Sequence, residues 1–228
     1  SYTRRFPPNL PKPDATKVRN AIRYSGSASV GPDGVHGLHY RGAPETSTEV
    51  LTNCTLALID PAAPEPPPTF CFARLALPPK KPPTWDEQFS AFIVDEDDTR
   101  PLSIHNFHQR IICSSMRDPV REAATAMTHD DQDGFLASTT KRIVSMDSTL
   151  HEFARSRTRG GVFLADIVKA FPSLSLVYCT IFLIITQCPI WLATAFRRMY
   201  HRVTHVPVSY THLRAHETRE DRVWRVLL

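Results

Sequence analysis

One long stretch of the chain, residues 170–196, contains no charged side chain. About 20 consecutive apolar residues are enough for a helix that crosses a membrane. Here Thr180 and Gln187 interrupt the run, and Pro189 would break a single helix near its end. We therefore predict two short helices, while a membrane-anchored protein held by residues 174–196 stays open as an alternative.

The overall composition is that of a folded protein. With 228 residues, of which 42% are hydrophobic, the chain can form one sizeable domain, or one domain and part of another. Its twenty prolines crowd into the first third, and they predict extended connectors in Phe6–Pro13, Pro61–Pro68 and Pro78–Pro83. The formal net charge of +4 permits a polyanionic partner without establishing one.

The five cysteines form neither a Cys-x-x-Cys pair nor a cluster with the spacing of a zinc site. Their odd number argues against a disulfide framework, so we expect an intracellular protein of the nucleus or cytoplasm. Ser1–Arg5 runs directly into prolines and shows no secretory leader. His36 with His39, and His105 with His108, are spaced to share a helical face, but no further ligand accompanies them, and we expect no metal site there.

Local patterns predict a helix and a strand early in the chain. Val18 and Ile22, four residues apart, favour a helix within Asp14–Tyr24 that Asp14 caps. The segment Phe70–Leu77 has the pattern of a short strand.

A second helical pattern covers Phe107–Met127, and we expect Pro119 to split it into two pieces. The acidic run Asp95–Asp98 precedes it. Adjacent carboxylates point in different directions and cannot all converge on one ion, so a solvated loop is expected there.

Two stripes of apolar residues predict amphipathic helices later in the chain. The first consists of Ile143, Met146, Leu150 and Phe153, and we expect its helix to pack on a sheet and to end at Gly160-Gly161. The second stripe predicts a helix with an apolar face for the core, formed by Leu192, Phe196, Met199, Tyr200 and Val203. Its opposite face is basic and is expected to meet solvent or phosphate through Arg197, Arg198 and Arg202. Between the two stripes, Val162–Ala165 is predicted to be a buried strand with Asp166 at its end.

Five short motifs follow one another along the chain: Gly31–Gly34, Leu77–Lys81, Arg100–Asn106, Gln132–Phe135 and Phe163–Phe171. Their order and rough spacing resemble the fingers and early palm of the reverse transcriptases of non-LTR (LINE-type) retrotransposons. Pro189–Val203 also resembles the palm helix that follows in that family. The resemblance implies an α+β fold, a partial right-hand polymerase with fingers and an incomplete palm.

The resemblance also implies an organisation along the chain. Residues 1–30 would be a lead-in segment, residues 31–160 the fingers region, and residues 161–207 the start of the palm. The segment Val208–Thr218 resembles a translated sequencing adapter, so we expect residues 208–228 to be an artefactual tail.

The resemblance assigns roles in phosphoryl transfer, a reaction that divalent ions held by carboxylates support. Asp166 matches the first metal-binding, catalytic aspartate of the family, and the carbonyl of Ile167 would assist it in binding Mg²⁺, or Mn²⁺. Phe171 matches the aromatic residue that selects deoxynucleotides at the sugar. Arg100 matches a fingers arginine that grips the triphosphate through its guanidinium fork.

Further contacts to template or phosphate are expected from Lys80, Lys81, Arg110, Gln132, Gly134 and Phe135. The implied partners are an RNA template, a DNA primer and deoxynucleoside triphosphates, and no membrane is expected. Purely structural roles stay open as alternatives to metal and sugar binding, because Asp166 could cap a turn and Phe171 could be an ordinary core residue.

The sequence departs from the family pattern in three places. Ser138 and Thr139 stand where the family has a Gly-Arg pair, and Pro172 and Ser173 stand where an acidic residue is common. No Gln-Gly-hydrophobic-Ser motif and no aspartate pair after an aromatic residue occurs before Leu228, so we expect these 228 residues to be inactive alone as an RNA-directed DNA polymerase. A non-catalytic nucleic-acid-binding remnant is the alternative, with contacts from Lys80, Lys81, Arg100, Arg110 and the basic face near Arg197.

Overall fold

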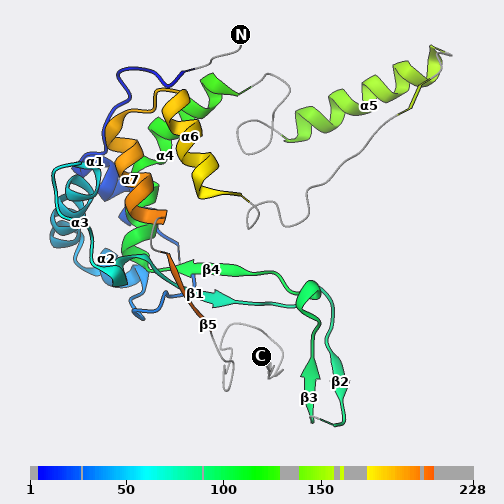
Figure 1. Ribbon diagram of the computed structural model, residues 1–228, viewed down its shortest axis with the longest axis horizontal. Coiled ribbons are helices and arrows are strands. Elements are labelled where there is room, and N and C mark those ends of the chain that lie inside the picture. The colour runs from blue at the N-terminus through cyan, green and yellow to red at the C-terminus, as the bar shows by residue number, and fades with distance from the viewer. Residues whose placement is uncertain are drawn as a thin grey trace.

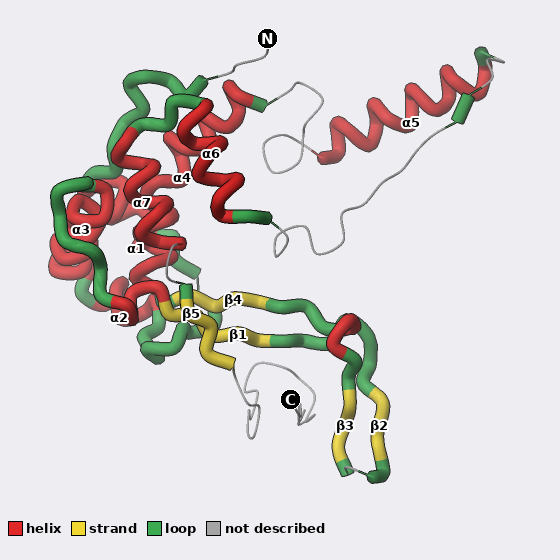
Figure 2. The backbone as a smooth tube through the Cα atoms, viewed as in Figure 1, coloured by secondary structure: helices red, strands yellow, loops and turns green. Residues whose placement is uncertain are grey.

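The structure is a computed structural model, and it describes residues 5–26, 28–88, 90–128, 139–156, 160–161, 174–200 and 203–207. It has an α+β fold in which a helical body carries a small sheet, while a two-stranded arm and one helix extend from it (Figure 1). Figure 2 shows the helices of the body gathered on one side and the strands extending away from them, while the outlying helix stands apart from both.

The first half of the body forms around helix α1, Ala15–Arg23. The Asp14 carboxylate accepts a hydrogen bond from the Lys17 N–H at 2.8 Å, so the predicted cap and helix are confirmed. Val18 and Ile22 are buried, and they pack with Leu51 of α3 (Pro44–Ile59) and Ile111 of α4 (Phe107–Met127). A short helix, α2 (Gly37–Gly42), joins α1 to α3.

Helix α4 is one continuous helix, so the expectation that Pro119 splits it is wrong. A proline inside a helix removes one backbone hydrogen bond. Pro119 is buried together with Met116 and Ala123 on the face that packs in the core, and this burial offsets the missing bond.

The uncharged stretch forms two helices, α6 (Leu176–Ile185) and α7 (Ile190–Tyr200), as predicted. Gln187 adopts a positive φ of 56° in the turn between them, just before Pro189. No helix in the described residues has both the length and the apolar character that a membrane crossing requires. Helix α7 packs in the second half of the core, where Ile112, Met116, Trp191, Leu192 and Met199 are buried.

The small sheet has the strand order β4-β1-β5. Strand β1 (Phe72–Ala76) lies within the predicted strand Phe70–Leu77, and the short 3₁₀ helix Pro68–Cys71 leads into it. It pairs antiparallel with β4 (Leu102–His105) and parallel with β5 (Thr204–Pro207), so Ala73 stands opposite both His105 and His205. Residues predicted to belong to the fingers and to the palm therefore share one sheet.

Strands β2 (Thr84–Asp86) and β3 (Ala91–Ile93) form a separate antiparallel hairpin. It projects from the end of β1 and β4 as an arm (Figure 1). Trp85 stands opposite Phe92 on it, with their rings edge-to-face at 5.1 Å. The acidic run Asp95–Asp98 lies at the base of the arm and includes the 3₁₀ turn Glu96–Asp98.

Helix α5 (Thr139–Arg155) confirms the predicted amphipathic helix but not its packing. It stands apart from the body (Figures 1 and 2), and its stripe is exposed, with 58% of Ile143 and 48% of Met146 accessible. The expectation that this helix packs on a sheet is therefore wrong in this structure. The helix also ends at Arg155, ahead of Gly160, because the pattern specifies a face and neither its partner nor its last turn.

Candidate nucleic-acid interface

The loop that holds the first motif docks on the start of helix α4. Gly31 accepts a hydrogen bond from the Gly34 N–H at 3.1 Å, and Gly34 has a φ of 70°, so these four residues form a turn. A side chain on Gly31 would meet the backbone of Asn106, whose Cα lies 2.6 Å from the position of a Cβ. The Asn106 amide oxygen also accepts a hydrogen bond from the Asp33 N–H at 3.2 Å. Gly31–Gly34 and the end of Arg100–Asn106 therefore touch directly.

Two arginines fasten the same loop through its carbonyl groups. Arg74 of β1 donates to the Gly31 carbonyl at 3.3 Å, and Arg110 of α4 donates to the Ser29 carbonyl at 2.7 Å. The Arg110 guanidinium also lies over the Phe107 ring, 3.8 Å from its centre. Burial lowers the pKa of Arg110, and the nearby Asp33 carboxylate opposes that shift. Arg110, predicted to contact template or phosphate, thus holds the loop in this structure.

Four histidines of the region have local partners. His36 caps α2 by accepting from the Leu38 N–H at 3.1 Å, and His39 accepts from the His36 N–H at the same distance. His105 lies 2.9 Å from the Gln109 side chain, and His108 lies 3.5 Å from the Asp33 carboxylate. Burial lowers the pKa of both His105 and His108.

The second and third motifs lie side by side where β1 and β4 continue toward the arm. The Arg100 N–H donates to the Pro78 carbonyl at 2.9 Å, and the Lys80 N–H donates to the Asp98 carbonyl at 2.6 Å. Both lysines also bind the acidic run, because Lys80 Nζ donates to the Asp97 carbonyl at 2.6 Å and Lys81 Nζ lies 3.0 Å from the Asp98 carboxylate. The acidic run therefore offsets part of the positive charge expected of Lys80 and Lys81.

Arg100 differs from these lysines. Its backbone N–H joins the extensions of β1 and β4 at the base of the arm, which we call the junction. Its side chain is exposed and pairs with no carboxylate of the described residues. An exposed guanidinium without a carboxylate partner can use all of its N–H donors to bind a ligand.

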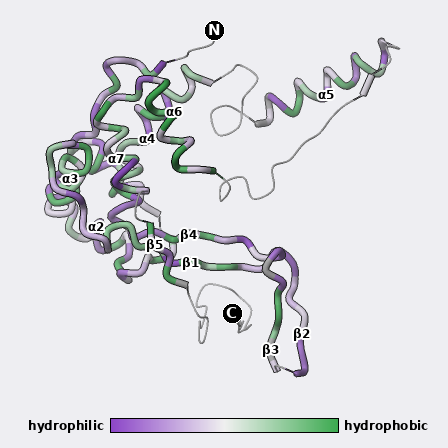
Figure 3. Tube along the Cα trace, viewed as in Figure 1, coloured by the Kyte–Doolittle hydropathy of each residue, from purple (hydrophilic) through white to green (hydrophobic). Residues whose placement is uncertain are grey.

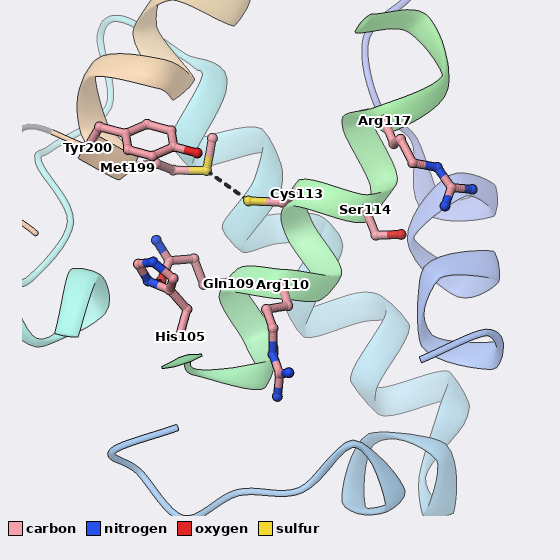
Figure 4. A pocket seen from close by; sticks show the side chains of 8 residues that line it. All are labelled: His105, Gln109, Arg110, Cys113, Ser114, Arg117, Met199 and Tyr200. Atoms are coloured by element: carbon pink, nitrogen blue, oxygen red, sulfur yellow. Dashed lines mark hydrogen bonds between the residues drawn. The ribbon is translucent and has the colours of Figure 1, made fainter. Parts of the chain in front are cut away.

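A pocket of about 380 Å³ lies between α4 and α7, next to His105 at the end of β4 (Figure 4). Cys113 Sγ lies 3.4 Å from Met199 Sδ on its wall, next to Tyr200. Arg110 and Arg117 line the pocket, but their guanidinium groups point away from Met199 and Tyr200 (Figure 4). Burial raises the pKa of the Cys113 thiol to about 11, so this thiol is protonated at neutral pH and is a weak nucleophile.

The pocket continues along the same two helices as an apolar groove of about 500 Å³. Sequence reasoning missed both hollows. The stripe that contains Met199 and Tyr200 indicated a packing face on α7, but nothing in it indicated that α4 leaves part of that face uncovered.

Six of the predicted site residues lie outside the described residues: Asp166, Ile167, Phe171, Gln132, Gly134 and Phe135. Their roles, and the site for Mg²⁺ or Mn²⁺, stay predictions. Within the described ranges, no three His, Cys, Asp or Glu side chains gather as metal ligands would.

The basic face expected on α7 needs a correction. Arg198 is only 3% exposed, and its guanidinium donates to the Ala57 and Asp60 carbonyls at 2.7 Å each and to the Leu58 carbonyl at 3.2 Å. The carbonyls of a last helical turn lack partners within the helix, so Arg198 caps the C-terminal end of α3. The expectation that Arg198 faces solvent or phosphate is therefore wrong. Its exposed neighbour Arg197 binds the Glu65 carboxylate.

No model of a known protein family matches the chain, and no curated protein is similar enough to it to count as a relative.

Proposed function

We propose that the chain is the fingers and the start of the palm of a non-LTR retrotransposon reverse transcriptase, an RNA-directed DNA polymerase. Its partners would be an RNA template, a DNA primer and deoxynucleoside triphosphates. The observation that carries the proposal is the meeting of three motifs in one continuous unit. Residues 31–34 contact the end of residues 100–106 at Asn106, and residues 77–81 contact the start of that third motif, where the Arg100 N–H donates to the Pro78 carbonyl.

The fit between Gly31 and Asn106 gives this meeting a physical basis. Gly31 cannot carry a side chain because the Asn106 backbone occupies that space, and the Asp33 N–H uses the Asn106 amide oxygen. Residues from two of the motifs thus depend on each other for packing and for hydrogen bonding.

Within this proposal, Arg100 is the described residue best placed to bind a triphosphate. Its side chain is exposed at the junction, whereas the lysines beside it already contact the acidic run. A planar guanidinium can grip two phosphate oxygens at once. Asp166 and the carbonyl of Ile167 are the proposed ligands of Mg²⁺ or Mn²⁺, and Phe171 is the proposed contact to the sugar.

The proposal is tested by photo-crosslinking the 228-residue chain with an azido-deoxyadenosine triphosphate. We expect crosslinking that excess deoxynucleoside triphosphate suppresses and the monophosphate does not. Arg100→Ala should weaken it at least about tenfold, the scale of a lost charge-assisted pair. Arg19→Ala, which removes an exposed arginine of α1 away from the junction, should leave it unchanged.

Equal crosslinking by the two variants would contradict the role of Arg100. If triphosphate and monophosphate compete equally while RNA–DNA duplex still binds in a salt-dependent manner, the chain is a non-catalytic nucleic-acid-binding module instead.

A further inference from the structure

Helix α6 has an apolar outer face that the body leaves uncovered. Leu183 packs against the core from the inner side of the helix. On the opposite side, 69% of Val177, 49% of Ile181 and 71% of Ile184 are exposed. The whole helix carries no charged residue, and Figure 3 shows it among the most hydrophobic parts of the chain. Only an apolar partner can cover such a face without leaving a charge desolvated.

Helix α5 exposes a second apolar face. Ile143 and Met146 are about half exposed, and Leu150 and Phe153 are exposed by more than a third. All four lie on one side of a 17-residue helix. A helix of this length is marginal in water on its own, and most helices gain their stability by packing such a face.

The two faces share one spacing. On α5 the apolar residues Ile143, Met146, Leu150 and Phe153 follow steps of three, four and three. On α6 the apolar residues Val177, Ile181 and Ile184 follow steps of four and three, which match the last two steps of α5. Apolar residues at alternating spacings of three and four form one stripe along a helix, and two such stripes can pack with the side chains of one helix between those of the other.

We propose that α5 docks on the outer face of α6, with its apolar stripe against the seam of Val177, Ile181 and Ile184. The segment between the helices, residues 156–175, has twenty residues and could extend to about 65 Å, so it does not prevent the contact. The tether also keeps the two faces at a high effective concentration, which favours this partner over a second molecule. The contact does not depend on the proposed polymerase function.

The groove between α4 and α7 is a less suitable partner for α5. Arg117 and Arg121 line that groove, and an apolar stripe laid into it would desolvate their charges. The seam of α6 contains no charge. Its charge-free surface and matching spacing therefore favour α6.

Hydrogen exchange of the full chain tests the contact with two adjacent variants. Ile143→Asp places a charge in the stripe, whereas Val144→Asp places the same charge one residue further, about 100° around the helix and off the stripe. Ile143 and Val144 have similar exposures of 58% and 61%, so neither substitution disturbs the core. We expect the α6 amides to exchange at least about tenfold faster in Ile143→Asp, and to stay as protected as in the original chain in Val144→Asp.

The contact should also be reciprocal and independent of protein concentration. Ile181→Asp on α6 should accelerate exchange in α5 to a similar extent. Unprotected α6 amides in the original chain, or equal effects of Ile143→Asp and Val144→Asp, would overturn the proposal. Protection that disappears on dilution would also overturn it, because a second copy would then be the partner.

Discussion

Helices α7 and α5 show the same amphipathic pattern in the sequence but occupy opposite environments. In α7 the stripe is largely covered, with Leu192 9% and Met199 7% exposed, although Tyr200 near its end is 44% exposed. In α5 the equivalent residues Ile143 and Met146 are about half exposed. Periodicity therefore identifies which residues share a face, while long-range partners decide whether that face is covered.

What distinguishes α7 is a polar anchor in addition to its apolar stripe. Arg198 reaches from α7 to the end of α3 and also to the Ala63 carbonyl and the Glu65 carboxylate. It joins two helices whose ends are far apart in the sequence. No described side chain of α5 is buried, so the described part of that helix has no counterpart of the buried Arg198.

The largest effect is expected from removing this anchor. Arg198→Ala leaves several carbonyl groups and the Glu65 carboxylate without their buried donor, so we expect it to lower the free energy of unfolding by about 3–5 kcal/mol. Arg198→Lys keeps the charge but loses the planar fork, and should recover only part of the loss. Urea denaturation followed by circular dichroism measures both variants.

Arg197→Ala is the matched control in the next position. Arg197 binds the same Glu65 carboxylate, but its side chain is 53% exposed. Solvent screens such a pair, so its loss should leave the free energy of unfolding nearly unchanged. Equal effects of the two substitutions would show that Arg198 does not anchor α7.

A smaller difference in unfolding free energy is expected between alanine substitutions at two glycines, one in the body and one beside α5. Gly31→Ala forces a methyl group into the Asn106 backbone and should cost about 1–3 kcal/mol, with no rescue by Asn106→Ala because the Asn106 Cα and N remain. At Gly160 the nearest atoms, at 3.0 and 3.1 Å, belong to the Phe153 side chain. Because that ring is partly exposed and can move, Gly160→Ala should be nearly neutral. Urea midpoints compare the two, and similar losses would contradict the tight fit at Gly31.

The sequence predicted the elements whose signals are local. Asp14 and the pair Val18 and Ile22 specify α1 through neighbours in the chain, and Pro189 separates α6 from α7. The predictions for Pro119 and Arg198, which depended on distant partners, were wrong. Pro119 stays helical because of the core against which α4 packs, and Arg198 is buried because the end of α3 supplies its acceptors.

The candidate site shows the same division. The motif order singled out Gly31–Gly34 and Arg100–Asn106, but the sequence could not show that Asn106 fills the space beside Gly31. Nor could it show that the acidic run, expected to be solvated, would contact Lys80 and Lys81. These contacts join residues 17 to 75 positions apart, beyond the range of periodicity and capping rules.

The smallest effect concerns a histidine in the body compared with one on α5. Burial lowers the pKa of His108 below its usual 6.5, although the Asp33 carboxylate opposes the shift. The unfolded chain therefore binds more protons than the folded chain below about pH 6.5, and the stabilising contribution of neutral His108 is lost as the pH falls through its folded pKa.

His108→Gln should flatten the decline of the unfolding free energy between neutral pH and about pH 5. His151→Gln on the exposed face of α5 should leave the decline unchanged. Urea titrations across this range measure both variants. An unchanged decline in His108→Gln would contradict the lowered pKa, because it would mean that the attraction of the Asp33 carboxylate fully balances the effect of burial.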